Sequence, residues 1–383
     1  MMDQEEIMVV CGSRIGEMTY ELLRRSGLSE LIRERFRDKD PLIALKPNLL
    51  GPIPASLGAT THPEIAGSVI GYLREEGFGR IVVMESSWVG DRTSDSLLVT
   101  GFGELCDRLE VPFWDLQQDE AIPVDCAGMT LNICQRALEA DFLINLPVMK
   151  GHCQTGMTCA LKNMKGCIPG GEKRRFHRMG LHEPIGHLSA GIRQDFILAD
   201  AICPDLNFED GGNPVALNRL ILARDPVLLD AFSLRQIGLE DGSVPYIRIA
   251  ERSGVGSADL SKARITTLME KTVQGECVYL ESGGEWSSLP WHGERDRILK
   301  VKEMVCDVDS CSACYGTLIP VLHRLEEEGL ASALPGQLCI GQGFRGRTGR
   351  IGIGNCTARF DTFLKGCPPD ECQIEQFLRS LMT

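Results

Sequence analysis

Residues 141–152, "DFLINLPVMKGH", place a short apolar run directly before a proline, a lysine and a histidine. A compact apolar run of this length that stops at polar residues is typical of a buried strand that ends in a loop. Two earlier stretches repeat the pattern: "PLIALK" (41–46) runs into Pro47-Asn48, and "RIVVMESS" (80–87) leads into Trp88-Val89-Gly90-Asp91. The repetition predicts three buried strands, each followed by a polar loop.

Helical patterns separate these strands. Thr61 and Glu64 have the spacing of a capping box, and Gly77 can end the helix that follows. The alternation continues through a helix-like stretch at about 94–109, "SAGIRQDFILADAI" (189–202), "NRLILARDP" (218–226) and "PVLLDAFSLRQIG" (226–238). Strands that alternate with helices predict an α/β fold, with a mostly parallel sheet and flanking helices.

A polar stretch, "ESGGEWSSLPWHGERDR" (281–297), interrupts this alternation. Stretches of this composition commonly connect domains, and we therefore place a domain boundary near residue 300. The prediction is an α/β domain over residues 1–300 and a small cysteine-rich domain over residues 301–383.

The composition narrows the function. The 383 residues are 43% hydrophobic, which is ordinary for a chain that buries a core, and carry a net charge of −13. This acidic balance argues against a nucleic-acid partner. The opening "MMDQEEIMVV" lacks the pattern of a secretory signal, and no run approaches the ~20 apolar residues of a membrane span. We expect a cytoplasmic protein without a membrane partner.

The sixteen cysteines are unevenly distributed, with seven in the last 78 residues. In a reducing compartment such a group indicates metal or redox chemistry rather than disulfides. A C-x-x-C pair (Cys311 and Cys314), a cysteine after a glycine-rich apolar run (Cys356) and a cysteine between glycine and two prolines (Cys367) predict four thiolate ligands.

Four thiolates suit a single [4Fe-4S] cluster, since soft sulfur ligands bind one iron each. The small glycine beside Cys367 lets a bulky cluster approach the backbone, and the prolines make the chain stiff. Zinc at the same cysteines is the alternative, although the second half of the set is two separated cysteines rather than a pair. Cys306, Cys339 and Cys372 are left over, with Cys372 the most plausible substitute ligand.

Several stretches resemble the domain of unknown function 362 family. They include "KPNLL" (46–50), "ATTHPE" (59–64), "NLPVMKGHCQTGMTCALKNMKGCIPG" (145–170) and "RDPVLLDAFSLRQIG" (224–238), and the resemblance covers roughly residues 40–258. The resemblance implies an iron–sulfur protein. Many members carry C-x-x-C-x-x-C runs, which are missing here. The C-terminal cysteines are instead similar to a variant pattern that ends in G-C-P-P, which implies one cluster rather than two.

The three strand ends predict a binding site, because ligands of parallel sheets bind beyond the carboxyl ends of the strands. The block that follows residue 145 is basic in an otherwise acidic chain, and its local positive field suits a small carboxylate or phosphate. The alternative is a solvated basic helix. We assign catalysis to Lys150, His152 and Asp91, and substrate binding to Lys46, Asn48, Asn145, Lys162, Asn163 and Lys165.

Cys153, Cys159 and Cys167 raise the further possibility of a second metal site, although their spacing matches no common motif. No G-x-G-x-x-G follows a strand, so a nicotinamide cofactor is not indicated.

The leading hypothesis is an oxidoreductase that passes electrons through the cluster to the small anion, with a ferredoxin or similar protein as partner. One alternative is a lyase or isomerase with a structural or Lewis-acid cluster. The other is a protein that binds or delivers clusters without turnover.

Overall fold

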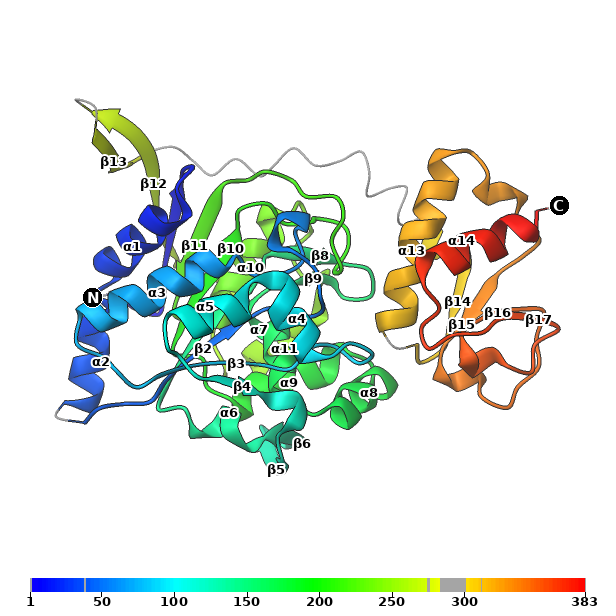
Figure 1. The fold of residues 1–383 in the computed structure, drawn as a ribbon, viewed down its shortest axis with the longest axis horizontal. Helices are drawn as coiled ribbons and strands as arrows, with labels where there is room; N and C mark the ends of the chain where they lie inside the picture. The colour runs from blue at the N-terminus through cyan, green and yellow to red at the C-terminus, as the bar shows by residue number, and fades with distance from the viewer. Residues whose placement is uncertain (1, 38, 274–275, 283–300, 311, 383) are drawn as a thin grey trace.

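The computed structural model describes residues 2–37, 39–273, 276–282, 301–310 and 312–382. Within these ranges, nine strands form one large sheet in the order β13-β12-β1-β11-β10-β7-β2-β3-β4 (Figure 1). The strands are β1 (Glu6–Cys11), β2 (Ile43–Pro47), β3 (Ile81–Glu85), β4 (Phe113–Asp115), β7 (Phe142–Leu146), β10 (Phe196–Ala201), β11 (Arg219–Ala223), β12 (Arg264–Val273) and β13 (Glu276–Glu281). Of the helices in the described part, none has both the length and the apolar composition to cross a membrane.

The predicted α/β fold with a mostly parallel sheet is confirmed. β10, β7, β2, β3 and β4 run parallel to one another, as do β1 and β12. β11 is antiparallel to both of its neighbours, since only the loop of residues 202–218 joins it to β10. A direct loop returns the chain in the opposite direction, whereas a crossover helix keeps strands parallel.

Helices cover both faces of this sheet. They are α1 (Ile15–Ser26), α2 (Leu28–Phe36), α3 (Pro63–Glu75), α4 (Thr93–Thr100), α5 (Phe102–Arg108), α6 (Gln135–Glu139), α7 (Ala160–Asn163), α8 (Gly170–Met179), α9 (His182–Gly191), α10 (Pro226–Gln236) and α11 (Pro245–Arg252). Side chains alternate along each strand, so Ile43 and Leu45 of β2 pack with α1 to α3 and α5, whereas Ala44 packs with α6 to α11. Both faces of the strands are therefore apolar.

A second, smaller unit follows at the C-terminal end (Figure 1). In the described part it contains a parallel sheet of β14 (Val305–Asp307), β15 (Leu338–Ile340), β16 (Ile351–Ile353) and β17 (Thr362–Leu364), with α13 (Ser312–Glu327) and α14 (Glu371–Ser380). Its apolar core also contacts Cys153 and Phe208 of the first unit. The predicted boundary near residue 300 falls at the end of residues 283–300, which lie outside the described residues.

Several local predictions need correction. Thr61 does not cap α3: its hydroxyl donates to the Leu146 carbonyl and accepts from the Asn48 backbone N–H, so it joins two strand ends. The helix expected at 94–109 is two helices, α4 and α5, separated by Gly101 at φ 77°. β1 and two hairpins, β5 (Ala121–Cys126) with β6 (Met129–Cys134) and β8 (Lys150–His152) with β9 (Gly156–Thr158), were not anticipated.

A buried ion pair joins the carboxyl ends of β2 and β3. Lys46 Nζ lies 2.6 Å from Glu85 Oε2, and both side chains are almost inaccessible to solvent. The Glu85 carboxylate also accepts the backbone N–H groups of Leu49 (3.1 Å) and Ser86 (2.7 Å). The pair therefore fixes the first residues of both loops that leave the sheet.

We expect Glu85→Gln to lower the free energy of unfolding by about 3–5 kcal/mol, because it leaves the Lys46 charge buried without a counter-charge. Urea denaturation monitored by circular dichroism measures this. The matched control is Glu76→Gln, which breaks the exposed pair with Arg33 (2.8 Å) and should cost at most about 1 kcal/mol. Equal losses in the two variants would contradict a structural role for the buried pair.

Candidate functional site

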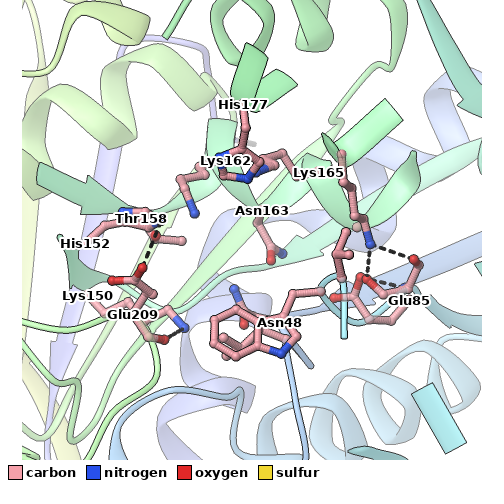
Figure 2. A pocket seen from close by; sticks show the side chains of 16 residues that line it. Asn48, Glu85, Lys150, His152, Thr158, Lys162, Asn163, Lys165, His177 and Glu209 are labelled. Carbon is pink, nitrogen blue, oxygen red and sulfur yellow. Dashed lines mark hydrogen bonds and ion pairs between the residues drawn. The ribbon is translucent and has the colours of Figure 1, made fainter. Parts of the chain in front are cut away.

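A cavity of about 90 Å³ opens at the carboxyl ends of β2, β3 and β7, several times the roughly 10–15 Å³ that one water molecule needs (Figure 2). Its walls combine apolar and basic side chains. They comprise Asn48, Leu50, Glu85, Ser86, Trp88, Val89, Lys150, His152, Thr158, Lys162, Asn163, Lys165, Gly166, Lys173, His177 and Glu209. The volume and the basic lining suit a small anion.

The elements that leave the sheet at this edge supply the walls. Asn48 follows β2, and Trp88 follows β3. After β7 the chain forms the β8–β9 hairpin and then α7, so the basic block folds back over the strand ends instead of forming one solvated helix. Lys162 reaches into the cavity from the side opposite Asn48 (Figure 2).

Of the residues assigned from the sequence, six lie around this one cavity: Asn48, Lys150, His152, Lys162, Asn163 and Lys165. The other three lie behind its wall. Lys46 is held by Glu85, as described above. Asn145 is buried, and its amide N–H₂ group donates to the Ala160 carbonyl (3.0 Å) and to Gln194 (2.6 Å).

Asp91, the third catalytic candidate, also lies outside the lining. Its carboxylate accepts a hydrogen bond from the indole N–H of Trp88, and its carbonyl accepts one from Gln117 (2.8 Å). The reason is local geometry: the bend after β3 presents Trp88 to the cavity and turns Asp91 behind it. Asp91 therefore orients Trp88 and does not contact the cavity itself.

The tautomer of His152 follows from its surroundings. Nδ1 accepts hydrogen bonds from the backbone N–H groups of Gln154 (3.0 Å) and Thr155 (3.2 Å), so the proton of the neutral ring lies on Nε2. Burial, together with the charges of Lys162 and Lys165, lowers the pKa of His152 well below its usual value. The ring is neutral at pH 7, and its Nε2–H lies at the cavity wall, 3.6 Å from Glu209 Oε1 and beyond hydrogen-bond distance of it.

Burial also weakens the basicity of the lysines. It lowers the pKa of Lys150 to about 7, with a further contribution from the charge of Lys162, and it lowers the pKa of Lys162 to about 8. The pKa of Lys173 is about 8 for the same reason. These amines titrate near neutral pH, where a small change in proton concentration alters the charge of the cavity.

Three buried polar atoms at the cavity have no hydrogen-bond partner among the described residues: Asn48 Oδ1, His152 Nε2 and Thr158 Oγ1. A buried polar group without a partner costs about 1–3 kcal/mol. A ligand with several oxygen atoms would satisfy the His152 and Thr158 donors. The unsatisfied atoms therefore make the cavity a candidate binding site.

A possible metal group lies at one end of the cavity, where His152, Cys153 and Glu209 have ligand atoms within 4.8 Å of one another. A metal ion on His152 Nε2 would require the proton of the neutral ring to lie on Nδ1. Two backbone N–H groups already donate to Nδ1, so a proton there would meet two other donors. The Cys153 thiol donates to Glu209 Oε1 (2.9 Å), and burial followed by the Glu209 charge raises its pKa well above the usual value. These groups therefore form a hydrogen-bonded cluster around the Glu209 carboxylate.

The sequence-based idea that Cys153, Cys159 and Cys167 share a metal ion is not supported. Cys159 Sγ lies 3.5 Å from Ser233 Oγ, whereas Cys153 contacts Glu209. Burial raises the pKa of Cys167 to about 12. Glu209 is a wall residue outside the assigned set, although its position in the acidic loop after β10 made it a candidate to face the same cleft.

Comparison with known proteins identifies the family. The model of the family called "Domain of unknown function (DUF362)" matches residues 43–235. The chain belongs to this family. The match includes every residue assigned to the cavity from the sequence, and it confirms the resemblance noted above.

A related protein is the thylakoid-associated protein sll1697 of Synechocystis sp., which is 27% identical over 224 residues, covering 56% of this chain and 68% of that protein. Among solved structures, the lactate racemase apoprotein of Thermoanaerobacterium thermosaccharolyticum matches with a TM-score of 0.38 and 13% identity, over 58% of this chain and 55% of that chain. A protein of Thermotoga maritima matches with a TM-score of 0.31 and 13% identity, over 70% and 53%.

This DUF362 protein therefore spans only about half the length of either structural neighbour. Both TM-scores are below 0.5, which is too low to carry a functional inference.

Outside the matched family region, three of the four predicted ligands, Cys314, Cys356 and Cys367, lie on segments near the carboxyl ends of β16 and β17. Cys314 lies on α13, and its Sγ would be 3.3 Å from a Cβ atom placed on Gly354. The loops that carry Cys356 and Cys367 are hydrogen-bonded to each other, through Asn355 N–H to the Gly366 carbonyl (2.8 Å). Cys311 lies outside the described residues. The segments that carry Cys314, Cys356 and Cys367 therefore lie next to one another.

The left-over cysteines are placed differently. Cys306 and Cys339 lie opposite each other on β14 and β15, and burial together with Cys306 raises the pKa of Cys339 to about 11. Cys372 is exposed on α14.

We predict that sulfate affinity falls between roughly pH 6 and pH 9, since Lys150 (pKa about 7) and Lys162 (pKa about 8) are charged below and neutral above these values. Each lost charge-assisted hydrogen bond weakens binding by about 1.5–3 kcal/mol, or roughly tenfold to a hundredfold. Isothermal titration calorimetry measures the affinity. Lys162→Met should remove the upper part of the pH dependence, and a flat wild-type profile would contradict the site.

Proposed function

We propose that this DUF362 protein is an iron–sulfur oxidoreductase that acts on a small anionic substrate. In this proposal Cys311, Cys314, Cys356 and Cys367 hold one [4Fe-4S] cluster, and the cavity beyond β2, β3 and β7 holds the substrate. A ferredoxin or a similar protein would be the electron-transfer partner.

The observation that carries the proposal is that two cysteine-bearing segments contact the walls of the cavity. Ser310, the residue before Cys311, forms a backbone hydrogen bond with His177, which lines the cavity. Pro368, the residue after Cys367, lies close to Gly90: its Cδ would be 3.9 Å from a Cβ atom placed on that glycine. Gly90 directly follows the wall residues Trp88 and Val89. This proximity supports a redox role because it brings the two sites together.

When bound, a cluster of this kind exchanges single electrons at a potential set by its charge, hydrogen bonds and exposure. The residues of the chain have other tasks. Lys162 and Lys165 attract the anion, and the Nε2–H of His152 and the Thr158 hydroxyl donate to its oxygens. Trp88, Val89 and Leu50 supply the apolar part of the wall, which excludes water from part of the substrate.

A second candidate function is acid/base chemistry without electron transfer, such as that of a lyase or isomerase. It is favoured by the pKa values of Lys150 (about 7) and Lys162 (about 8), which suit proton transfer at neutral pH. In that case the cluster would stabilise the small unit, or zinc would occupy the same thiolates.

The cluster assignment predicts about four irons and four sulfides per chain after anaerobic purification. Cys367→Ser should lose most of the iron, because it removes one of four ligands. Cys339→Ser, which changes a thiol between two strands, should keep it. Iron, sulfide and zinc analysis of the three proteins measures this. Zinc in place of iron, or full iron in Cys367→Ser, would refute the assignment.

The redox role is tested on the iron-loaded protein by electron paramagnetic resonance after dithionite reduction. The proposal expects a signal of a reduced cluster that disappears on reoxidation. An iron-loaded cluster that dithionite does not reduce would favour the acid/base alternative.

A further inference from the structure

The buried lysines near the cavity differ in the number and kind of their hydrogen-bond acceptors. Lys46 bonds to the Glu85 carboxylate. Lys173 donates to three oxygens, the Ser86 carbonyl (2.7 Å), the Ser86 hydroxyl (2.6 Å) and the Ser87 carbonyl (2.7 Å). A carboxylate partner, or acceptors for all three N–H bonds, favours the ammonium form. The acceptors of Lys46 and Lys173 therefore hold both side chains in structural roles.

Lys150 is held differently. Its Nζ donates to two backbone carbonyls, those of Ala59 (2.5 Å) and Glu209 (2.6 Å), and its side chain is 1% exposed. A neutral amine has two N–H bonds, and these two carbonyls satisfy both. The remaining tetrahedral direction of the nitrogen then holds the lone pair, and Lys150 lines the cavity (Figure 2). The backbone thus orients Lys150 as a nucleophile.

We propose that Lys150 forms an imine with the carbonyl group of a small aldehyde or keto acid bound in the cavity. This inference rests on the anion site of the proposed function and names its substrate class: an anion that carries a carbonyl carbon within reach of Nζ. The charge of Lys162 and the Nε2–H of His152 would hold the carboxylate of the same molecule.

The reaction is a condensation without net oxidation. The Nζ lone pair attacks the carbonyl carbon, the carbonyl π electrons move to oxygen, and a proton passes from nitrogen to that oxygen to give a carbinolamine. The Lys162 ammonium then protonates the hydroxyl group, which leaves as water while the nitrogen lone pair forms the C=N bond. The product is a protonated imine, and its N–H proton returns through solvent to Lys162, which leaves the neutral imine and one water molecule.

The electrostatics agree with this role. Burial and the neighbouring Lys162 lower the pKa of Lys150 to about 7, although the acidic groups of the loop after β10 (Asp205, Glu209 and Asp210) oppose the shift. About half of the Lys150 amine is therefore neutral at pH 7, far more than for an ordinary lysine. An amine that is both neutral and desolvated is the usual form of an imine-forming lysine.

Reductive trapping tests the proposal. The full chain is incubated with glyoxylate, a small aldehyde that carries a carboxylate, and cyanoborohydride reduces any imine to a stable carboxymethyl group. Peptide mass spectrometry then locates the label. We expect Lys150 to be labelled at least tenfold faster than the exposed Lys262 and Lys271 in the same sample, with a rate that is half-maximal near pH 7. Labelling of Lys150 no faster than of these surface lysines would overturn it.

Two controls make the result specific. Excess sulfate should slow labelling of Lys150 in the wild-type chain and leave Lys262 unchanged, a test that needs no variant to fold. Lys150→Met, checked by circular dichroism, should lose the fast label without transferring it to Lys162. Fast labelling that moves to Lys162 would identify that residue as the nucleophile and refute the assignment to Lys150.

The experiment also separates this inference from the proposed function. Labelling requires no electron transfer, so Cys367→Ser protein should label at Lys150 like the wild type. Fast labelling with a cluster that cannot be reduced would leave the imine standing and refute the redox role. A reducible cluster in a protein whose Lys150 is not labelled would refute the imine and leave the redox role standing.

Discussion

The ion pair between Lys46 and Glu85 is the constraint on which the cavity depends. Two opposite charges that are inaccessible to solvent must stay together, because separating them would leave each one buried without compensation. The pair therefore fixes the ends of β2 and β3 relative to each other. A Cβ atom on Gly166 would clash with the Glu85 carboxylate and lie 2.6 Å from Lys46 Nζ, so only glycine lets the turn after α7 pack on the pair. That turn carries Lys165, and α7 directly before it carries Lys162, over the strand ends.

The burial of several lysines in an acidic chain is explained by how each is satisfied. Lys46 has a carboxylate, Lys173 has three oxygens, and Lys150 has two carbonyls. Lys46 thus forms an ion pair, and Lys173 links α8 to the loop after β3. Lys150 has a pKa of about 7 and changes its protonation near neutral pH. The difference comes from the backbone around each nitrogen, since the lysine side chains are chemically identical.

The two units of the chain are joined by more than the linking segment. Phe208 packs edge-on to His323 with ring centroids 6.0 Å apart, and Gln154 donates to Ser310 (3.0 Å). Gln154 follows His152 by two residues and also donates its backbone N–H to that ring. The interface between the units therefore adjoins the wall of the cavity at Gln154.

The sequence by itself determined several strands of the large sheet and the polar loops that follow them. Apolar runs such as residues 142–146 and 81–85 are strands because their side chains face helices on both sides of the sheet, and parallel topology brings their carboxyl ends to one edge. That is why Asn48, Lys150 and His152 could be grouped in advance. The prediction that Thr61 caps α3 was wrong. It rested on the spacing of Thr61 and Glu64 alone, whereas the Thr61 hydroxyl forms hydrogen bonds that join the ends of β2 and β7.

Only the tertiary structure decided the chemical state of these residues. Whether a lysine is a charged partner or a neutral amine depends on acceptors supplied by segments distant in sequence, such as Ala59 and Glu209 around Lys150. Likewise, Asp91 follows its strand as Asn48 does, yet it turns to Trp88 behind the wall. Residue type and spacing limit which groups can reach an edge, but burial and hydrogen bonding, which arise only when the chain is folded, set their orientation and protonation.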